Sequence, residues 1–224
     1  MSDDGDDEGS NDLAGLVVDY GGVLTSTLHD TMAAWAEADG IDVSQFTDAM
    51  KKWLQSSYGE QSSANPVHAL ERGEIEMPHF EEQLAARLTT RDGQPIVAEG
   101  LLGRMFAGFQ QQPVMLEALR RARASGVKTA LLSNSWGMDY PREGWDELFD
   151  AVVISGEVGM RKPEPDIYRH VADRLGLPPD RCVMVDDITS NVKGAMAVGM
   201  VGVHHKDPER TVEELEALFG IALH

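Results

Sequence analysis

The sequence predicts an α/β protein, a Rossmann-like doubly wound parallel sheet with helices between its strands. Two observations lead to this fold class. Five short apolar runs without clean polar and apolar alternation are spread along the chain, and helical segments separate the later ones. Strands that are buried on both faces have this composition, as in a parallel sheet that helices cover. From residue 113 onward, the alternation of helix and strand favours a doubly wound arrangement.

The strand and helix candidates follow from apolar runs, helical spacing and terminating glycines. The expected strands cover residues 13–18, 127–132, 151–154, 182–185 and 201–204. A helix opens at Pro113 and closes at Gly126, and two more cover residues 166–175 and 190–198. Thr211 and Glu214 form a capping-box pattern that predicts the start of a last helix.

A long interval between the first two expected strands has helical rather than strand character. Its expected helices cover residues 30–38, 44–55, 78–88 and 97–109. We interpret residues 27–110 as a helical insertion above the sheet, and residues 13–26 with 111–224 as the α/β core. Residues 1–12 contain six acidic residues and no basic one, so we expect a disordered acidic tail.

The charge balance excludes some classes of partner. The chain has 224 residues, with 38 acidic against 19 Lys and Arg, and a formal net charge of −19. Such a charge argues against nucleic acid or an anionic membrane as partner, because phosphates would be repelled. The single cysteine, Cys182, excludes an internal disulfide, and its apolar run indicates a buried thiol. Without a signal-like start or a membrane-length apolar run, we expect a cytoplasmic protein.

Polar residues follow the expected strands and form one candidate site. In open α/β sheets, ligands bind at the carboxyl ends of the strands. The residues at these ends, or in the loop after the third strand, are Asp19, Ser133, Asn134, Lys162, Asp186 and Asp187. Crowded carboxylates favour a bound cation, and a hard dication such as Mg²⁺ takes oxygen ligands. Hydroxyl, amide and ammonium groups suit phosphate oxygens, so the set predicts a phosphate ester held against Mg²⁺.

The same residues carry a family resemblance. The segments Val-Val-Asp-Tyr-Gly-Gly-Val-Leu, Leu-Leu-Ser-Asn-Ser, Lys-Pro-Glu-Pro-Asp-Ile-Tyr and Val-Asp-Asp-Ile-Thr-Ser-Asn resemble the four ordered motifs of the haloacid dehalogenase (HAD) superfamily. The most similar subfamily is the one that contains the N-terminal phosphatase domain of soluble epoxide hydrolases. This resemblance covers residues 13–205 and implies the sheet order 5-4-1-2-3 with a helical cap after the first strand.

The resemblance also implies a role for each motif residue. Asp19 would be the nucleophile and a Mg²⁺ ligand, and the backbone carbonyl of Gly21 would be a second ligand. Asp187 would bind the metal directly, and Asp186 would support the metal shell. The phosphoryl group would be bound by Ser133 and Asn134. Lys162 would neutralise charge on the nucleophile and the phosphate.

One position departs from the phosphatase pattern. Phosphatases of this superfamily usually carry a second Asp two residues after the nucleophile, where this chain has Gly21. That Asp protonates the leaving oxygen and later activates water, a contribution of about 10²–10⁴-fold. Without a substitute, activity should favour good leaving groups. His29 and Asp30 lie where the chain enters the insertion and are the first candidates for a substitute.

Three functions follow, in order of preference. The first is a Mg²⁺-dependent phosphatase acting on a small phosphorylated metabolite, as a monomer or homodimer. The second is a phosphate-binding or regulatory module that lost turnover with the acid at position 21. The third is a dehalogenase-like hydrolase, against which Asp186 and Asp187 count, because members with that activity lack these paired acids.

Overall fold

The structure, a computed structural model, describes residues 13–55, 65–137 and 139–224. Five parallel strands form one sheet in the order β3-β2-β1-β4-β5. Their bounds are Gly15–Val18 for β1, Lys128–Ser133 for β2, Ala151–Ile154 for β3, Cys182–Asp186 for β4 and Val201–His204 for β5. This order is the predicted 5-4-1-2-3 read from the opposite edge, and the predicted fold class is confirmed. The predicted acidic tail at residues 1–12 lies outside the described residues.

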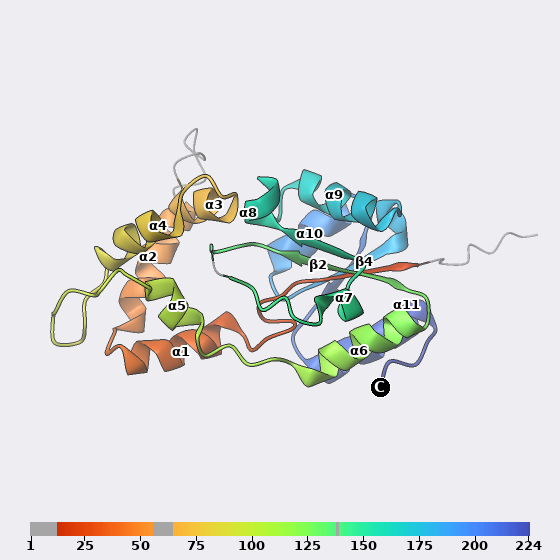
Figure 1. Ribbon diagram of the computed structural model, residues 1–224, viewed down its shortest axis with the longest axis horizontal. Helices are drawn as coiled ribbons and strands as arrows, with labels where there is room; N and C mark the ends of the chain where they lie inside the picture. Colours follow the sequence, from red (N-terminus) through yellow and green to blue (C-terminus); the bar gives the residue numbers. More distant parts are fainter. Residues whose placement is uncertain (1–12, 56–64, 138) are drawn as a thin grey trace, which may run out of the picture.

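Helices cover both faces of the sheet (Figure 1). Leu16 and Val18 of β1 belong to the apolar cluster of α6 (Pro113–Ala124), α7 (Trp145–Leu148) and α11 (Pro208–Phe219). Val17, pointing the other way, belongs to the cluster of α9 (Pro165–Leu175) and α10 (Thr189–Ala197). A short helix α8 (Ser155–Val158) follows β3 directly, and a 3-10 turn (Pro179–Arg181) precedes β4. The alternating side chains of β1 therefore explain why its run is apolar throughout.

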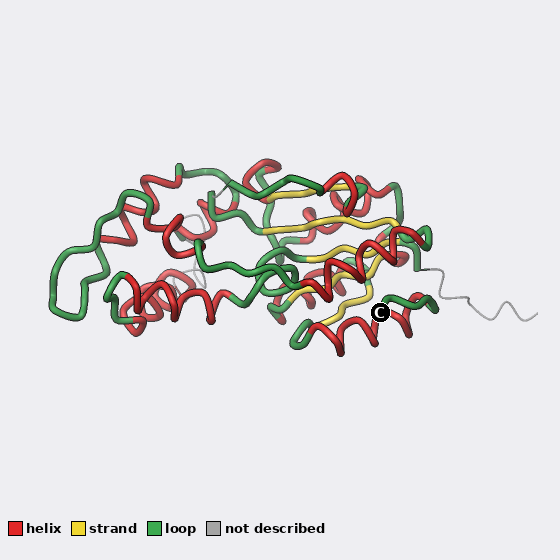
Figure 2. The backbone as a smooth tube through the Cα atoms, turned by 60° about the horizontal axis from the view of Figure 1, so that its bottom comes forward, coloured by secondary structure: helices red, strands yellow, loops and turns green. Residues whose placement is uncertain are grey.

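Between β1 and β2, the described residues form five helices of the insertion, followed by α6, which packs on the sheet. The five are α1 (Leu28–Ala38), α2 (Val43–Gln55), α3 (Pro66–Glu71), α4 (Met77–Ala85) and α5 (Leu101–Phe106). Their apolar core, which includes Trp35, Phe46 and Phe80, is separate from the two clusters of the sheet. The tube in Figure 2 shows the insertion beyond one end of the strands. None of the helices in the described ranges is long and apolar enough to cross a membrane.

The two connections between sheet and insertion run side by side. Thr25 and Gln111 form an antiparallel bridge, and the amide of Ser26 donates to the carbonyl of Gln110 at 2.7 Å. The amide of Gln112 donates to the carbonyl of Leu24 at 2.9 Å. The two linkers between the sheet and the insertion are thus hydrogen-bonded to each other. This pairing fixes the orientation of the insertion relative to the sheet.

The structure corrects two local predictions and adds one helix. Residues 97–100 precede α5 rather than belong to it, because Gly100 takes a left-handed conformation directly before the helix. The helix α3 was not predicted; Asn65 caps it by accepting from the amide of Val67. Thr211 is not a helix cap. Asp207 caps α11, since Pro208 begins the helix one turn earlier.

Candidate active site

The carboxyl ends of β1 and β4 bring the predicted acidic residues together. Asp19 follows β1 directly, and its amide donates to the carbonyl of Val185 at 3.0 Å, which holds the two strand ends in register. Asp186 ends β4, and Asp187 begins the loop to α10. One carboxylate oxygen from each of Asp19, Asp186 and Asp187 lies within 4.8 Å of the others. Three acidic groups from two strands thus face one another at one edge of the sheet.

Lys162 lies between two of these carboxylates. Its Nζ is 2.8 Å from Asp19 Oδ1 and 2.6 Å from Asp186 Oδ2, and the residue is fully buried. Burial alone would lower the pKa of Lys162, but Asp186 and Asp19 outweigh that effect and raise it. The lysine is therefore a fixed positive charge beside the nucleophile candidate. A buried charge of this kind needs its partners, because desolvation is costly without them.

The three carboxylates have different partners. Asp186 accepts from the amide of Ile188 at 2.8 Å and from Asn191 Nδ2 at 3.0 and 3.1 Å, so both of its oxygens are occupied. Asp19 Oδ1 accepts from the amide of Tyr20 at 2.7 Å as well as from the lysine, which leaves Oδ2 as its free oxygen within the described part of the chain. Asp187 Oδ1 is buried and has no hydrogen-bond partner among the described residues.

This donor set fits a hard dication. The three carboxylates and the lysine carry two net negative charges when ionised, which one dication would balance. Burial raises the pKa of Asp19 and Lys162 opposes this, while Asp186 raises it further. A buried carboxylate oxygen without a partner among the described residues, such as Asp187 Oδ1, is the kind of atom that a bound cation satisfies. Oxygen ligands in this number are the ones that Mg²⁺ prefers.

Asn134 holds the segment that presents the lysine. Its Oδ1 accepts from the amide of Lys162 at 2.9 Å, and its Nδ2 donates to the carbonyl of the same residue at 3.0 Å. This paired contact joins the loop after β2 to the loop before α9. The side-chain amide of Asn134 also acts on Glu71, whose pKa it lowers against the larger effect of burial. Binding of a phosphoryl group by Asn134 stays a prediction. The sequence did not indicate that Asn134 also holds the backbone of Lys162 in position.

Ser133 has a neighbour that the sequence analysis missed. Its Oγ lies 3.0 Å from the phenolic oxygen of Tyr140, which comes from the irregular loop after β2. The Tyr140 ring packs edge-on against Tyr20 at 5.1 Å and against Trp145 at 5.8 Å between centroids. No periodic pattern marks residues 139–144, so nothing in the sequence predicts that this loop folds back over Ser133.

A cavity of about 450 Å³ opens above these groups, between the sheet edge and the insertion. Its floor includes Asp19, Gly21, Ser133, Asn134 and Lys162. The opposite wall is formed by apolar side chains, most of them from the insertion: Phe46, Met50, Val67, Phe106, Phe109 and Trp136. Trp136 lines the cavity and also packs edge-on against Phe80 and Phe106, so it belongs to both the pocket and the insertion core. The site is charged at its floor and apolar at its roof.

The last residue of α3, Glu71, and the turn after it join the insertion to the core. Glu71 Oε2 accepts from Arg161 Nε at 2.5 Å, with both side chains nearly buried at the cavity rim. The carbonyl of Glu71 also accepts from Ser155 Oγ. Gly73 comes so close to the core that a Cβ there would lie 2.7 Å from the carbonyl oxygen of Gly156. Burial raises the pKa of Glu71, and Arg161 opposes this.

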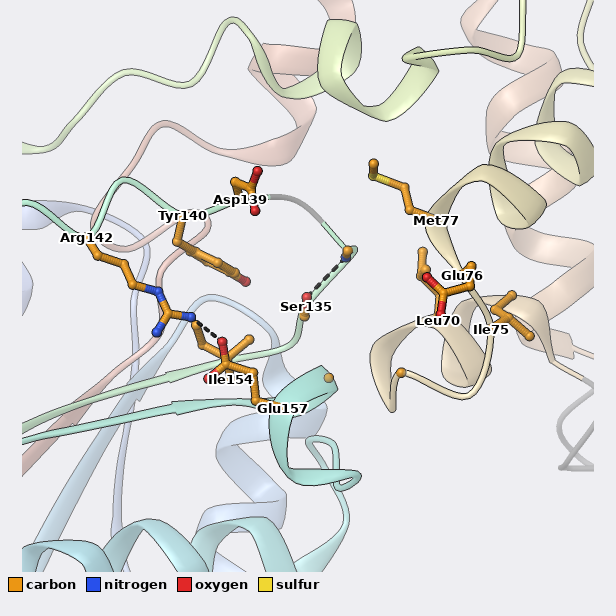
Figure 3. A pocket seen from close by; sticks show the side chains of 13 residues that line it. Leu70, Ile75, Glu76, Met77, Ser135, Asp139, Tyr140, Arg142, Ile154 and Glu157 are labelled. Carbon is orange, nitrogen blue, oxygen red and sulfur yellow. Dashed lines mark hydrogen bonds and ion pairs between the residues drawn. The ribbon is translucent and has the colours of Figure 1, made fainter.

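A second cleft of about 370 Å³ lies between this turn and the loop after β2. Figure 3 shows Tyr140 on its loop side, with Met77 and Glu76 across from it. Tyr140 lines both this cleft and the larger cavity, so it lies at the boundary between them. Arg142 on the same loop is paired with Glu157.

The remaining titratable residues of interest are as follows. His29 is exposed and does not line the cavity, and the side chain of Asp30 lies outside the described residues. His204 Nε2 lies 3.0 Å from the backbone oxygen of Asp187, on the outer side of the acidic cluster. Cys182 is buried as predicted, and burial raises the pKa of its thiol to about 11, which makes it a poor nucleophile.

Residues 13–199 match the model of the haloacid dehalogenase-like hydrolases. The chain belongs to this family of hydrolases. A sesquiterpene phosphatase of Aspergillus oryzae is 34% identical over 156 residues, which cover 67% of this HAD-like hydrolase and 77% of that protein. Acyl-CoA dehydrogenase family member 10 of Mus musculus is 30% identical over 96% of this chain. Bifunctional epoxide hydrolase 2 of Rattus norvegicus is 34% identical over 47% of it, in agreement with the subfamily resemblance.

The match to the two mammalian proteins is partial, since the aligned HAD-like segment spans about a fifth of either one. Among solved structures, a HAD family enzyme of Bacteroides thetaiotaomicron superposes with a TM-score of 0.65 at 20% identity, covering 92% of this chain and 98% of that one. The same enzyme is known in a complex with magnesium and inorganic phosphate, with a TM-score of 0.62 at 19% identity and coverages of 87% and 94%. At these identities the likeness concerns the fold.

Proposed function

We propose that this HAD-like hydrolase is a Mg²⁺-dependent phosphatase that hydrolyses a small phosphomonoester through an aspartyl-phosphate on Asp19. The observation that carries the proposal is the group of three carboxylates around a buried lysine. The metal would be held by Asp19, Asp187 and the carbonyl of Gly21, with Asp186 supporting the shell. When bound, Mg²⁺ supplies positive charge that lets a phosphate dianion approach a carboxylate. The magnesium and phosphate complex of the Bacteroides enzyme supports this choice of ion.

Each of these side chains has a separate role in the proposed reaction. Asp19 Oδ2, the oxygen without a hydrogen bond, attacks phosphorus while Oδ1 stays bound by Lys162 and the amide of Tyr20. Ser133 and Asn134 bind the phosphoryl group, with the Ser133 hydroxyl toward its ester oxygen. Water then attacks the aspartyl-phosphate and releases inorganic phosphate, so that one difficult hydrolysis becomes two easier steps. The fixed lysine also offsets the charge that accumulates when a dianion binds beside a carboxylate.

The apolar roof indicates the kind of substrate. Residues 27–110 act as a cap in this proposal, and their apolar side chains bind the carbon part of the ester. A cavity of about 450 Å³ takes a small metabolite, and its aromatic roof favours an apolar carbon chain or ring over a sugar. The relative named a sesquiterpene phosphatase supports an apolar carbon skeleton. The proposed partner is thus a small phosphorylated metabolite, bound by a cytoplasmic monomer or homodimer.

A panel of phosphate esters with apolar and polar carbon parts, assayed with and without Mg²⁺, tests the proposal. The expected result is phosphate release that requires Mg²⁺ and is fastest for apolar esters. Metal-independent dehalogenation without phosphate release would instead identify a dehalogenase-like hydrolase. Mg²⁺ binding without turnover of any ester would identify the phosphate-binding module that the glycine at position 21 suggests.

A further inference from the structure

The absence of an acid at Gly21 raises the question of which group protonates the leaving oxygen. Among the described side chains that line the cavity, the proton donors near the strand ends are few. His29 is exposed and outside the cavity, and Glu71 is bound by Arg161 at 2.5 Å at the rim. Tyr140 is the donor in hydrogen-bond contact with a predicted phosphoryl-binding residue, 3.0 Å from Ser133 Oγ.

We propose that Tyr140 is the general acid of this enzyme and delivers its proton to the leaving oxygen across the hydroxyl of Ser133. The assignment rests on the proposed phosphatase function. A serine hydroxyl donates one hydrogen bond and accepts two, so Ser133 can accept from Tyr140 and donate to the substrate at the same time. The phenol then takes the place of the carboxylic acid that the family usually has at position 21.

The proton and the electrons balance in both steps. Asp19 Oδ2 forms the bond to phosphorus, and the bond from phosphorus to the leaving oxygen breaks with its electron pair on that oxygen. The Ser133 proton moves to the leaving oxygen and the Tyr140 proton moves to Ser133, which gives a neutral alcohol and a tyrosinate. In the second step, water loses a proton to the tyrosinate along the same path as its oxygen attacks phosphorus. Inorganic phosphate, the Asp19 carboxylate and the neutral phenol result.

The surroundings of Tyr140 suit this role. Burial raises the pKa of its hydroxyl to about 12, with the bond to Ser133 opposing and Asp19 adding to the effect. The phenol therefore keeps its proton at neutral pH and remains a stronger acid than an aliphatic alcohol. Edge-on contacts with Tyr20 and Trp145 fix the ring, so the hydroxyl is held in place before the substrate arrives. The second cleft borders the same side chain (Figure 3).

The test is the dependence of kcat/KM on the leaving-group pKa, measured on aryl and alkyl phosphates with Mg²⁺ present. The native enzyme should show a shallow dependence. Tyr140→Phe keeps the ring and removes the proton, so it should lose about 10²–10⁴-fold on alkyl phosphates and only a few-fold on aryl phosphates. Tyr20→Phe removes a phenolic hydroxyl from the adjacent ring and should leave the slope as in the native enzyme.

A second substitution that restores the lost activity makes the test more specific. A Cβ at Gly21 would meet no atom within 4 Å, and this glycine does not need a left-handed backbone. Gly21→Asp in the Tyr140→Phe background should restore alkyl turnover, whereas Gly21→Asn, similar in shape but unable to give a proton, should not. In the native background, where the phenol already acts, Gly21→Asp should change alkyl turnover only a few-fold. That single variant keeps the proposal testable if Tyr140→Phe folds poorly.

Several results would overturn the assignment. These are a steep native slope, an equal loss on both ester classes in Tyr140→Phe, and a 10²-fold gain on alkyl phosphates in Gly21→Asp alone. A steep slope in Glu71→Gln with a shallow one in Tyr140→Phe would assign the proton to the insertion instead. These results leave the phosphatase itself intact, since they need measurable Mg²⁺-dependent turnover. A native protein that hydrolyses no ester would overturn the proposed function, and the role of Tyr140 with it.

Discussion

The floor and the roof of the cavity are built by different kinds of interaction. On the floor, charged groups are held by specific polar contacts, as Lys162 is by Asp19 and Asp186. On the roof, apolar side chains such as Phe46 and Phe109 come from different parts of the insertion, and the charged pair of Glu71 and Arg161 lies at the rim. In the proposed function, the floor determines which bond is broken and the roof determines which molecule is held.

The largest effect should come from the floor. Asp19→Asn should reduce hydrolysis of any phosphate ester to below about one per cent of native, because a neutral amide cannot form the covalent intermediate. The side chain is nearly isosteric, so the unfolding midpoint should stay close to native. Phosphate release under single-turnover conditions is the measurement. A variant that keeps more than a few per cent of the activity would remove the nucleophile assignment.

The buried lysine should contribute to stability as well as to the proposed reaction. Lys162→Met leaves the carboxylates of Asp19 and Asp186 buried without their cation, which should lower the free energy of unfolding by about 3–5 kcal/mol. Lys193→Met, at an exposed position on α10, is the matched control and should change it by less than about 0.5 kcal/mol. Urea unfolding without metal measures both. Equal losses in the two variants would mean that the buried pairs contribute nothing specific.

Substitutions in the roof should change the preference among substrates rather than the chemical step. Phe109→Ala removes part of an apolar wall, so kcat/KM for a long-chain phosphate should fall about 10- to 100-fold, equivalent to roughly 1.5–3 kcal/mol of lost burial. A short-chain ester with the same phosphate should lose less than about three-fold. Val97→Ala, in the insertion but 67% exposed and outside the cavity, should change neither. A uniform loss on both esters would contradict the division between floor and roof.

The sequence predicted the residues of the cavity floor but not those of its roof. The floor could be predicted because its members lie at strand ends or, for Lys162, in the loop after the third strand, and the parallel sheet brings Asp19, Ser133 and Asp187 to one edge. The roof depends on how helices pack against one another. Phe46 and Phe109 are 63 residues apart in sequence, and no local pattern shows that they share one wall. Tyr140 and the Glu71–Arg161 pair escaped prediction for the same reason, because both depend on loops that meet only in the folded chain.

A smaller effect should appear at the contact between the two sides. Gly73 and Gly93 both have left-handed backbones, with φ of +70° and +81°, but only a Cβ at Gly73 would meet the core, 2.7 Å from the oxygen of Gly156. Gly93→Ala should therefore cost about 1 kcal/mol of backbone strain, and Gly73→Ala about 2–3 kcal/mol. Urea unfolding of the two variants isolates the contact of insertion with core. Equal losses of unfolding free energy in the two variants would show that the contact between Gly73 and Gly156 adjusts to a Cβ at no extra free-energy cost.

The central claim is that the carboxylates at the edge of the sheet form a dication site, and the thermal midpoint with and without Mg²⁺ tests it most directly. Binding to the folded state stabilises by RT ln(1 + [L]/Kd), about 2.7 kcal/mol at one hundred times the dissociation constant. The native protein should therefore melt several degrees higher in millimolar Mg²⁺. Asp187→Ala should abolish this rise, and Asp173→Ala, at an exposed position on α9, should keep it. A native midpoint that does not respond to Mg²⁺, or a rise that survives in Asp187→Ala, would contradict the account.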